Sequence, residues 1–210
     1  MCGILGVYSN NLKLQKENIN KLIFQSKIRG LHSFGTSYLL YNNIRTKKTL
    51  NYPDDKFLEE CFFSKMLIYH NRYSTSGDWK NENNNQPISF DNISIAMNGV
   101  ISMKTKDEFE KDFNVKCQTE NDSEIFLRIL QKTFNPVKTL KICNGSIATV
   151  FIYNKNIYAI RNKHRPLHCF QFQGTNYVCS TNDIAYRALK IQTIEIEPNK
   201  LFNIKNFKYE

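Results

Sequence analysis

The chain has 210 residues, of which 41% are hydrophobic and 13% aromatic, so its composition excludes a disordered chain and allows a sizeable core. A net charge of +10 suggests nucleic-acid binding, but lysine and arginine are spread along the whole chain and the longest basic run is the short segment 45–48, so we expect no nucleic-acid partner. Six isolated cysteines, no signal peptide and no run of ~20 apolar residues predict a cytoplasmic protein without a membrane segment.

Hydrophobic periodicity predicts strands and helices that alternate in groups along the chain. The first predicted strand is 4–8, and a helix over 17–28 follows and ends near Gly30. The other predicted strands are 37–41, 65–70, 93–97, the hairpins 146–161 and 168–180, and parts of 193–204. The other predicted helices begin at capping boxes at Thr105–Glu108 and Asn121–Glu124, or occupy 182–190.

Two segments carry no clear periodicity. The charged stretch 42–64 is expected to be partly loop and partly helix, and 74–87 is expected to be a long loop. A loop of that length in a compact domain is usually functional or disordered. Because helices fall between groups of strands, the pattern as a whole predicts a layered α+β fold in one domain.

The second residue is a candidate nucleophile. Removal of Met1 is favoured when a small residue follows, and it would leave Cys2 with both a thiol and an α-amine. Such an amine ordinarily has a pKa of about 7.7–8.0, so near pH 7 a neutral fraction is available to take the thiol proton. The thiolate attacks, and Gly3 permits close approach of a substrate to the backbone. Taken alone, a cysteine at position 2 more often has no catalytic role.

Three downstream segments offer the other groups that attack on an amide requires. Strand 93–97 runs into Asn98 and Gly99, which offer a side-chain N–H and an unobstructed backbone N–H to an oxyanion. Arg72 is suited to bind a substrate carboxylate, and Asp122, in the first turn of a helix, to bind an ammonium. Each has a structural alternative: Asn-Gly commonly makes a turn, and an acid at a helix start favours the helix dipole.

The ordered segments MCGILG, RGLHSFG, HNRYSTSG, NNQP, MNG and TENDSE resemble the class II glutamine amidotransferase (glutaminase) domain of the N-terminal-nucleophile hydrolase superfamily. The later segments NGSIATVFIYNKNIYAIRNKHRPL and CSTND are similar to the second half of that domain, so the likeness runs from Met1 to about residue 200. RYST followed by QP is most similar to the glutaminase halves of amidophosphoribosyltransferase and glucosamine-fructose-6-phosphate aminotransferase.

The resemblance implies a four-layer αββα sandwich that hydrolyses L-glutamine to glutamate and ammonia through a thioester on Cys2. It also implies that Asn98 and Gly99 form the oxyanion hole, and that no cofactor and no metal ion are needed. The positions that match substrate-binding residues are Arg72, Tyr73, Thr75, Ser76 and Asp122. Arg29 and Gly3 match positions that support the surroundings of the nucleophile.

The sequence departs from the family pattern where His32 and Asn162 replace two aspartates. Relatives usually fuse the glutaminase to a synthase that consumes the ammonia. We therefore expect residues 1–210 to form a single free-standing domain without a fused synthase, which supplies ammonia to a separate acceptor enzyme. The alternative is a weakly active or inactive module of the same fold that binds glutamine or a partner in a regulatory role.

Overall fold

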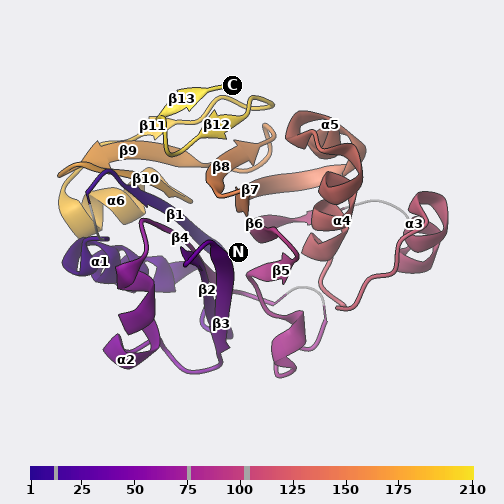
Figure 1. The fold of residues 1–210 in the computed structure, drawn as a ribbon, viewed down its shortest axis with the longest axis horizontal. Helices are drawn as coiled ribbons and strands as arrows, with labels where there is room; N and C mark the ends of the chain where they lie inside the picture. Colours follow the sequence, from indigo (N-terminus) through magenta and orange to yellow (C-terminus); the bar gives the residue numbers. More distant parts are fainter. Residues whose placement is uncertain (12–13, 75–76, 102–104) are drawn as a thin grey trace.

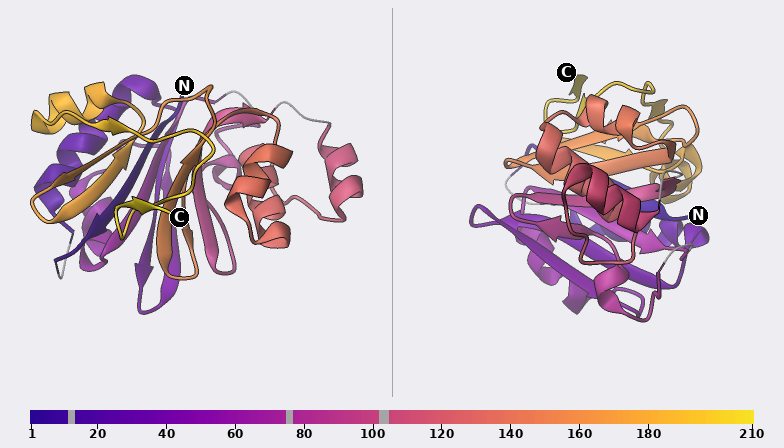
Figure 2. Two further views of the ribbon diagram at one scale, coloured as in Figure 1. Left: turned by 90° about the horizontal axis from the view of Figure 1, so that it is seen from above. Right: turned by 90° about the vertical axis from the view of Figure 1, so that its right-hand side faces the viewer.

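The computed structural model describes residues 1–11, 14–74, 77–101 and 105–210. Its main feature is a pair of antiparallel sheets stacked face to face, with helices on the outer side of each (Figures 1 and 2). The strand order is β11-β9-β10-β1-β4-β2-β3 in the first sheet and β13-β12-β8-β7-β6-β5 in the second. The first sheet contains β1 (Gly3–Ser9), β2 (Ser33–Leu40), β3 (Asn43–Thr49), β4 (Met66–Arg72), β9 (His168–Phe172), β10 (Thr175–Cys179) and β11 (Ile194–Glu195). The second contains β5 (Ile88–Phe90), β6 (Ile93–Ile101), β7 (Gly145–Tyr153), β8 (Asn156–Arg161), β12 (Phe202–Asn203) and β13 (Lys208–Tyr209).

The helices are divided between the two outer faces (Figure 1). Those beside the first sheet are α1 (Lys16–Ser26) with the 3-10 helix η1 (Lys27–Arg29), α2 (Asp55–Leu58) with η2 (Glu59–Phe63), and α6 (Asn182–Leu189). Those beside the second sheet are α3 (Lys106–Phe113), α4 (Ser123–Thr133) and α5 (Pro136–Ile142). A further 3-10 helix, η3 (Glu82–Asn84), precedes β5. The predicted four-layer αββα sandwich is confirmed.

Strand β1 shows how the alternation of side chains builds these layers. Leu5 and Val7 pack into the core between the first sheet and α1, whereas Ile4 packs into the core between the two sheets. Successive side chains of a strand point to opposite faces. Cys2, two residues before Ile4, is therefore on the side of the first sheet that faces the second, and its contacts with the second sheet agree with this.

Strand β3 corrects the expectation of loop or helix for the start of segment 42–64. It pairs with β2 and forms the edge of the first sheet. Its sequence, NIRTKKT, lacks the hydrophobic run that predicts a buried strand. Its charged side chains are typical of an edge strand that is partly exposed to water. The helical part of the expectation is met by α2.

The starts of the helices give a mixed outcome. The capping box of Thr105 and Glu108 is confirmed. The one predicted for Asn121 and Glu124 is wrong, because Asp122 is the N-cap residue of α4 and the Glu124 carboxylate is bound elsewhere. Helix α5 was not predicted, although Asn135 followed by Pro136 is a typical helix start.

In the described ranges, every helix is too short or too polar to cross a lipid bilayer.

Candidate active site

Cys2 lies at the start of β1, a strand flanked by β10 and β4 in the first sheet. Its backbone N–H donates a hydrogen bond of 3.1 Å to Oδ1 of Asn98, which belongs to β6 in the second sheet. Its thiol donates to the carbonyl oxygen of Tyr73 at 3.5 Å, and Nε of Arg29 donates to its carbonyl oxygen at 2.8 Å. The thiol is thus held where the two sheets face each other.

The two polar atoms of the Asn98 side chain differ in their hydrogen bonding. Its side chain is buried, and Oδ1 faces Cys2 because the backbone N–H of Cys2 is a donor. Among the described residues its Nδ2 has no hydrogen-bond partner. A buried donor without a partner costs about 1–3 kcal/mol and needs an explanation. A buried amide N–H group without a partner among the described residues, on a side chain bonded to the backbone of Cys2, is what a negatively charged oxygen would bind.

Gly99 follows in the same strand and pairs with Ile147 of β7. A Cβ atom at this position would lie 1.9 Å from the carbonyl oxygen of Ser146, so the β6–β7 pairing accepts only glycine here. Asn98 and Gly99 are part of a strand, and the alternative that they form a turn is wrong.

Arg72 ends β4, and its guanidinium is buried. It donates to the carbonyl oxygen of Asn84 at 2.7 Å, to Oδ1 of Asn85 at 2.6 Å and to the carbonyl oxygen of Gly77 at 3.4 Å. These acceptors are neutral, so they orient the guanidinium without neutralising its charge.

Tyr73 is half exposed and contributes its carbonyl oxygen to the site. Two further predicted substrate-binding positions, Thr75 and Ser76, lie outside the described residues.

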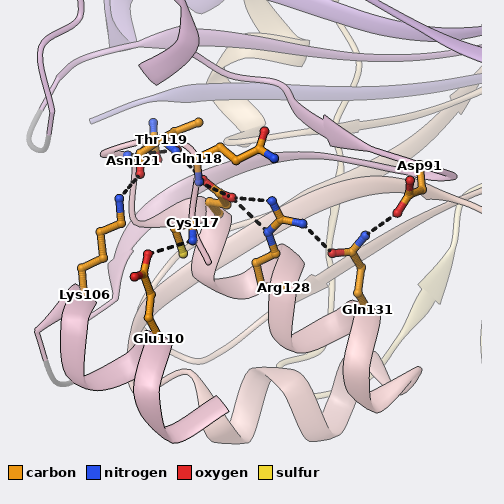
Figure 3. Close-up of polar contacts among 10 residues, drawn as sticks. Asp91, Lys106, Glu110, Cys117, Gln118, Thr119, Asn121, Arg128 and Gln131 are labelled. Atoms are coloured by element: carbon orange, nitrogen blue, oxygen red, sulfur yellow. Dashed lines mark hydrogen bonds and ion pairs between the residues drawn. The ribbon is translucent and has the colours of Figure 1, made fainter. Parts of the chain in front are cut away.

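Asp122 is the N-cap residue of α4, and its Oδ2 accepts a hydrogen bond of 2.9 Å from the backbone N–H of Ile101 at the end of β6. The loop before it is fixed by carboxylates of the neighbouring helices (Figure 3). Glu124 accepts from the backbone N–H groups of Gln118 and Thr119 and pairs with Arg128. The position of Asp122 therefore depends on the buried contacts of Glu124. The sequence predicts a different role for Glu124, as part of a capping box with Asn121.

Charges around the thiol act in opposite directions. Burial raises the pKa of the Cys2 thiol, and the negative charge of Asp122 adds to the rise. The hydrogen bond to Tyr73 and the positive charge of Arg72 lower it. Arg72 and Asp122 are thus both within electrostatic reach of the sulfur. The pKa of the Met1 α-amine is lowered by burial and by the charges of Arg29 and Arg165, so this amine loses its proton more readily than an exposed one.

Asn71 was missed as a site residue. It faces Gly3 across the β1–β4 pair, and a Cβ atom at Gly3 would lie 2.2 Å from its Oδ1. Its Nδ2 donates to the carbonyl oxygens of Ser26 and Gly30, so its side chain is fixed. Gly3 is therefore needed for this contact. The motif HNRYSTSG contains Asn71, but only the strand register shows which residue its side chain meets.

A cavity of about 640 Å³ is lined by residues that include Met1, Arg29, His32 and Tyr73. Elsewhere, Nδ1 of His168 forms a hydrogen bond of 3.0 Å with the hydroxyl of Thr193. No group of three histidine, cysteine, aspartate or glutamate side chains within the described ranges is arranged to hold a metal ion.

A model of the glutamine amidotransferase domain family matches residues 70–186, which is more than half of the chain. The chain belongs to the glutamine amidotransferase domain family. The match includes the segments that carry Arg72, Asn98, Gly99 and Asp122. The fold and the segments quoted above resemble those of the class II type of this domain.

The curated relatives that the chain matches are distant in sequence and longer than the chain. The chain is 27% identical to an amidophosphoribosyltransferase of Archaeoglobus fulgidus, with all of this chain and 50% of the relative covered. It is 26% identical to a 7-cyano-7-deazaguanine synthase of Saccharolobus solfataricus, with 80% of this chain and 40% of the relative covered. The chain thus spans about half the length of the curated relatives it matches.

Solved structures show the same fold. The glutamine phosphoribosylpyrophosphate amidotransferase of B. subtilis superposes with a TM-score of 0.77 at 16% identity, covering 100% of this chain and 49% of the other. A glutamine aminotransferase class-II domain protein from Silicibacter pomeroyi gives a TM-score of 0.60 at 12% identity, covering 95% and 93% of the two chains.

Proposed function

We propose that this glutamine amidotransferase domain hydrolyses L-glutamine to glutamate and ammonia, with Cys2 as the nucleophile. The proposal rests above all on the side chain of Asn98. Its Oδ1 accepts a hydrogen bond from the backbone N–H of Cys2, and its Nδ2 is buried with no partner among the described residues. An oxyanion formed when the thiol attacks an amide carbon would supply that partner.

The reaction proceeds in two steps at Cys2. The α-amine, free once Met1 is removed, takes the thiol proton, and Sγ attacks the side-chain amide carbon of glutamine. The oxyanion is stabilised by Nδ2 of Asn98 and the backbone N–H of Gly99. The α-ammonium of Cys2 then gives its proton to the amide nitrogen, and collapse of the oxyanion expels ammonia and leaves a thioester. Water then attacks the thioester carbonyl, and release of glutamate restores the thiol.

Two charged groups would hold the amino-acid end of the substrate. Arg72 binds the α-carboxylate, and Asp122 binds the α-ammonium. The charges of both groups act on the pKa of Cys2, which supports their lying near the sulfur. Arg29 fixes the carbonyl of Cys2 and keeps the start of β1 in place.

We further propose that the ammonia passes to an acceptor enzyme. The matched relatives carry the names of a transferase and a synthase.

The decisive measurement is glutamate release from glutamine, together with mass spectrometry of the intact chain after exposure to the glutamine analogue diazo-oxo-norleucine. Removal of Met1 and one label on Cys2 are expected, and Cys2→Ala should abolish both label and turnover. Asn98→Ala should lower kcat by about 10²–10³, the usual effect of losing one oxyanion donor. Asn92→Ala, an exposed asparagine in the turn before β6, is the matched control and should leave kcat unchanged.

The same samples distinguish the proposed enzyme from the alternative, a regulatory module that binds glutamine or a partner. Calorimetry that detects glutamine binding, without glutamate release even when candidate acceptors are present, would favour a binding module. Neither binding nor turnover in the protein that has lost Met1 would reject both.

A further inference from the structure

The imidazole of His32 lies between two aromatic rings. It stacks on Tyr73 with ring centroids 5.1 Å apart and an interplanar angle of 22°, and on Trp79 at 5.2 Å and 20°. The strand register explains the first contact: Ser33 of β2 pairs with Arg72 of β4, so the preceding residue, His32, comes opposite Tyr73. The second contact brings Trp79 back to the same ring.

His32 also bonds to the backbone next to these rings. Its Nδ1 accepts a hydrogen bond of 2.9 Å from the backbone N–H of Ser74. Its own backbone N–H donates to the carbonyl oxygen of Arg72 at 3.0 Å. We call His32, Tyr73, Ser74 and Trp79 the His32 clamp, because one imidazole contacts both residues 73–74, directly after β4, and the ring of Trp79.

The clamp reaches the candidate active site from both sides. On one side, the carbonyl oxygen of Tyr73 accepts the hydrogen bond of the Cys2 thiol. On the other, the carbonyl oxygen of Trp79 accepts from Nδ2 of Asn85 at 2.8 Å, and Oδ1 of the same amide accepts from Arg72 at 2.6 Å. A shift of either ring would therefore be passed on to the thiol or to the guanidinium.

We infer that His32 is a positioning residue that fixes the Tyr73 carbonyl and the Arg72 guanidinium for glutamine. The inference rests on the proposed function and adds to it a residue that carries no chemistry itself. The family aspartate at this position would accept a hydrogen bond but could not stack, and a phenylalanine would stack but could not accept. Histidine does both, so replacement of the acid here exchanges one kind of support for another.

Three variants separate the two contributions. His32→Asn keeps an acceptor near the place of Nδ1 and loses the ring, His32→Phe keeps the ring and loses the acceptor, and His32→Ala loses both. We expect His32→Ala to raise the KM for glutamine about tenfold with a smaller change in kcat, and the other two to lie between it and the parent protein. Tyr41→Ala, an exposed aromatic residue at the far end of β2, should change neither constant.

A second readout does not depend on turnover. Trp79 is the only tryptophan of the chain, so its fluorescence reports directly on the stacked ring. In His32→Ala its emission should shift to longer wavelength and acrylamide should quench it more strongly, whereas His32→Phe should resemble the parent protein. These measurements are made on the folded full chain, below the thermal midpoint of each variant.

The outcomes test the clamp, the positioning role of His32 and the proposed function separately. Parent-like fluorescence and quenching in His32→Ala would overturn the clamp whether or not the protein is an enzyme. Altered fluorescence with an unchanged KM for glutamine would overturn the positioning role. If the parent protein shows no label on Cys2 and no glutamate release, the proposed function fails, and with it the positioning role, while the fluorescence still decides whether the clamp exists.

Discussion

The buried histidine His70 should make this protein sensitive to mild acid. His70 is fully buried on β4, opposite Ile4 of β1 and Gly35 of β2. Burial lowers the pKa of its imidazole from 6.5 to about 3; the nearby positive charges of Arg72 and Lys48 add to the lowering, while a backbone contact opposes it. The folded protein therefore holds this side chain neutral over a pH range in which the unfolded chain binds a proton.

The size of the effect follows from linkage between proton binding and folding. Between pH 6.5 and about pH 3 the unfolded state binds more protons at this site, so stability rises with pH through this window and falls as the solution is acidified. At about pH 5, one and a half units below the ordinary value, the loss relative to about pH 7.5 amounts to roughly 2 kcal/mol. That is a large part of the 5–15 kcal/mol by which a typical domain is stable.

The variant His70→Leu removes the titrating group. Urea unfolding followed by Trp79 fluorescence would be measured at several pH values for both proteins. The free energy of unfolding of the parent protein should fall by about 2 kcal/mol relative to the variant between about pH 7.5 and pH 5. Packing changes caused by leucine shift the variant equally at every pH, so they do not affect this comparison.

His164→Leu is the control, because its exposed imidazole keeps its contact with water in the folded chain. Its stability should follow that of the parent protein at every pH. Parallel curves for the parent protein and His70→Leu would refute the reasoning, since they would show that His70 titrates alike in the folded and unfolded states.

Three further changes test other parts of the structure. Arg128→Met should lower the free energy of unfolding by about 3 kcal/mol in urea titrations, because it leaves the buried Glu124 carboxylate without its ion pair; an unchanged midpoint would contradict this. Gly99→Ala should abolish glutamate release and lower the thermal midpoint, because its Cβ would collide with the Ser146 carbonyl; normal turnover would exclude the clash. In chain that retains Met1, iodoacetamide should label Cys2 more slowly than a free thiol at neutral pH and faster as pH rises, since burial raises the thiol pKa; mass spectrometry that finds rapid labelling at pH 7 would argue against it.

The candidate site joins two sheets, and this explains why residues far from the thiol should affect it. Cys2 and Arg72 belong to the first sheet, while Asn98 belongs to the second and Asp122 is attached to the end of the same strand, β6. A change in the packing between the sheets would move the thiol relative to Asn98 and Gly99, the proposed oxyanion donors. Substitutions in the core between the sheets, such as at Ile4, are therefore expected to change catalysis as well as stability.

Local sequence signals were sufficient where the structure depends on neighbours in the chain. The capping box at Thr105–Glu108 and the turn at Asn154–Lys155 involve residues only a few positions apart, and both are present. The order of the quoted motifs also predicted the fold class. These features follow from backbone preferences and side-chain spacing, which are properties of short segments.

The tertiary structure alone decided the contacts between distant residues. Cys2 and Asn98 are 96 residues apart, and no periodicity indicates that the backbone of one orients the amide of the other. The same holds for the stacking of His32 on Trp79. It also holds for Glu124, whose side chain binds the preceding loop and does not form the predicted capping box. The sequence by itself indicated most of the elements and most candidates for the chemistry, but not β3, α5 or Asn71. Which side chains meet depended on strand register and on the packing of the two sheets, because these are set by burial summed over the whole chain.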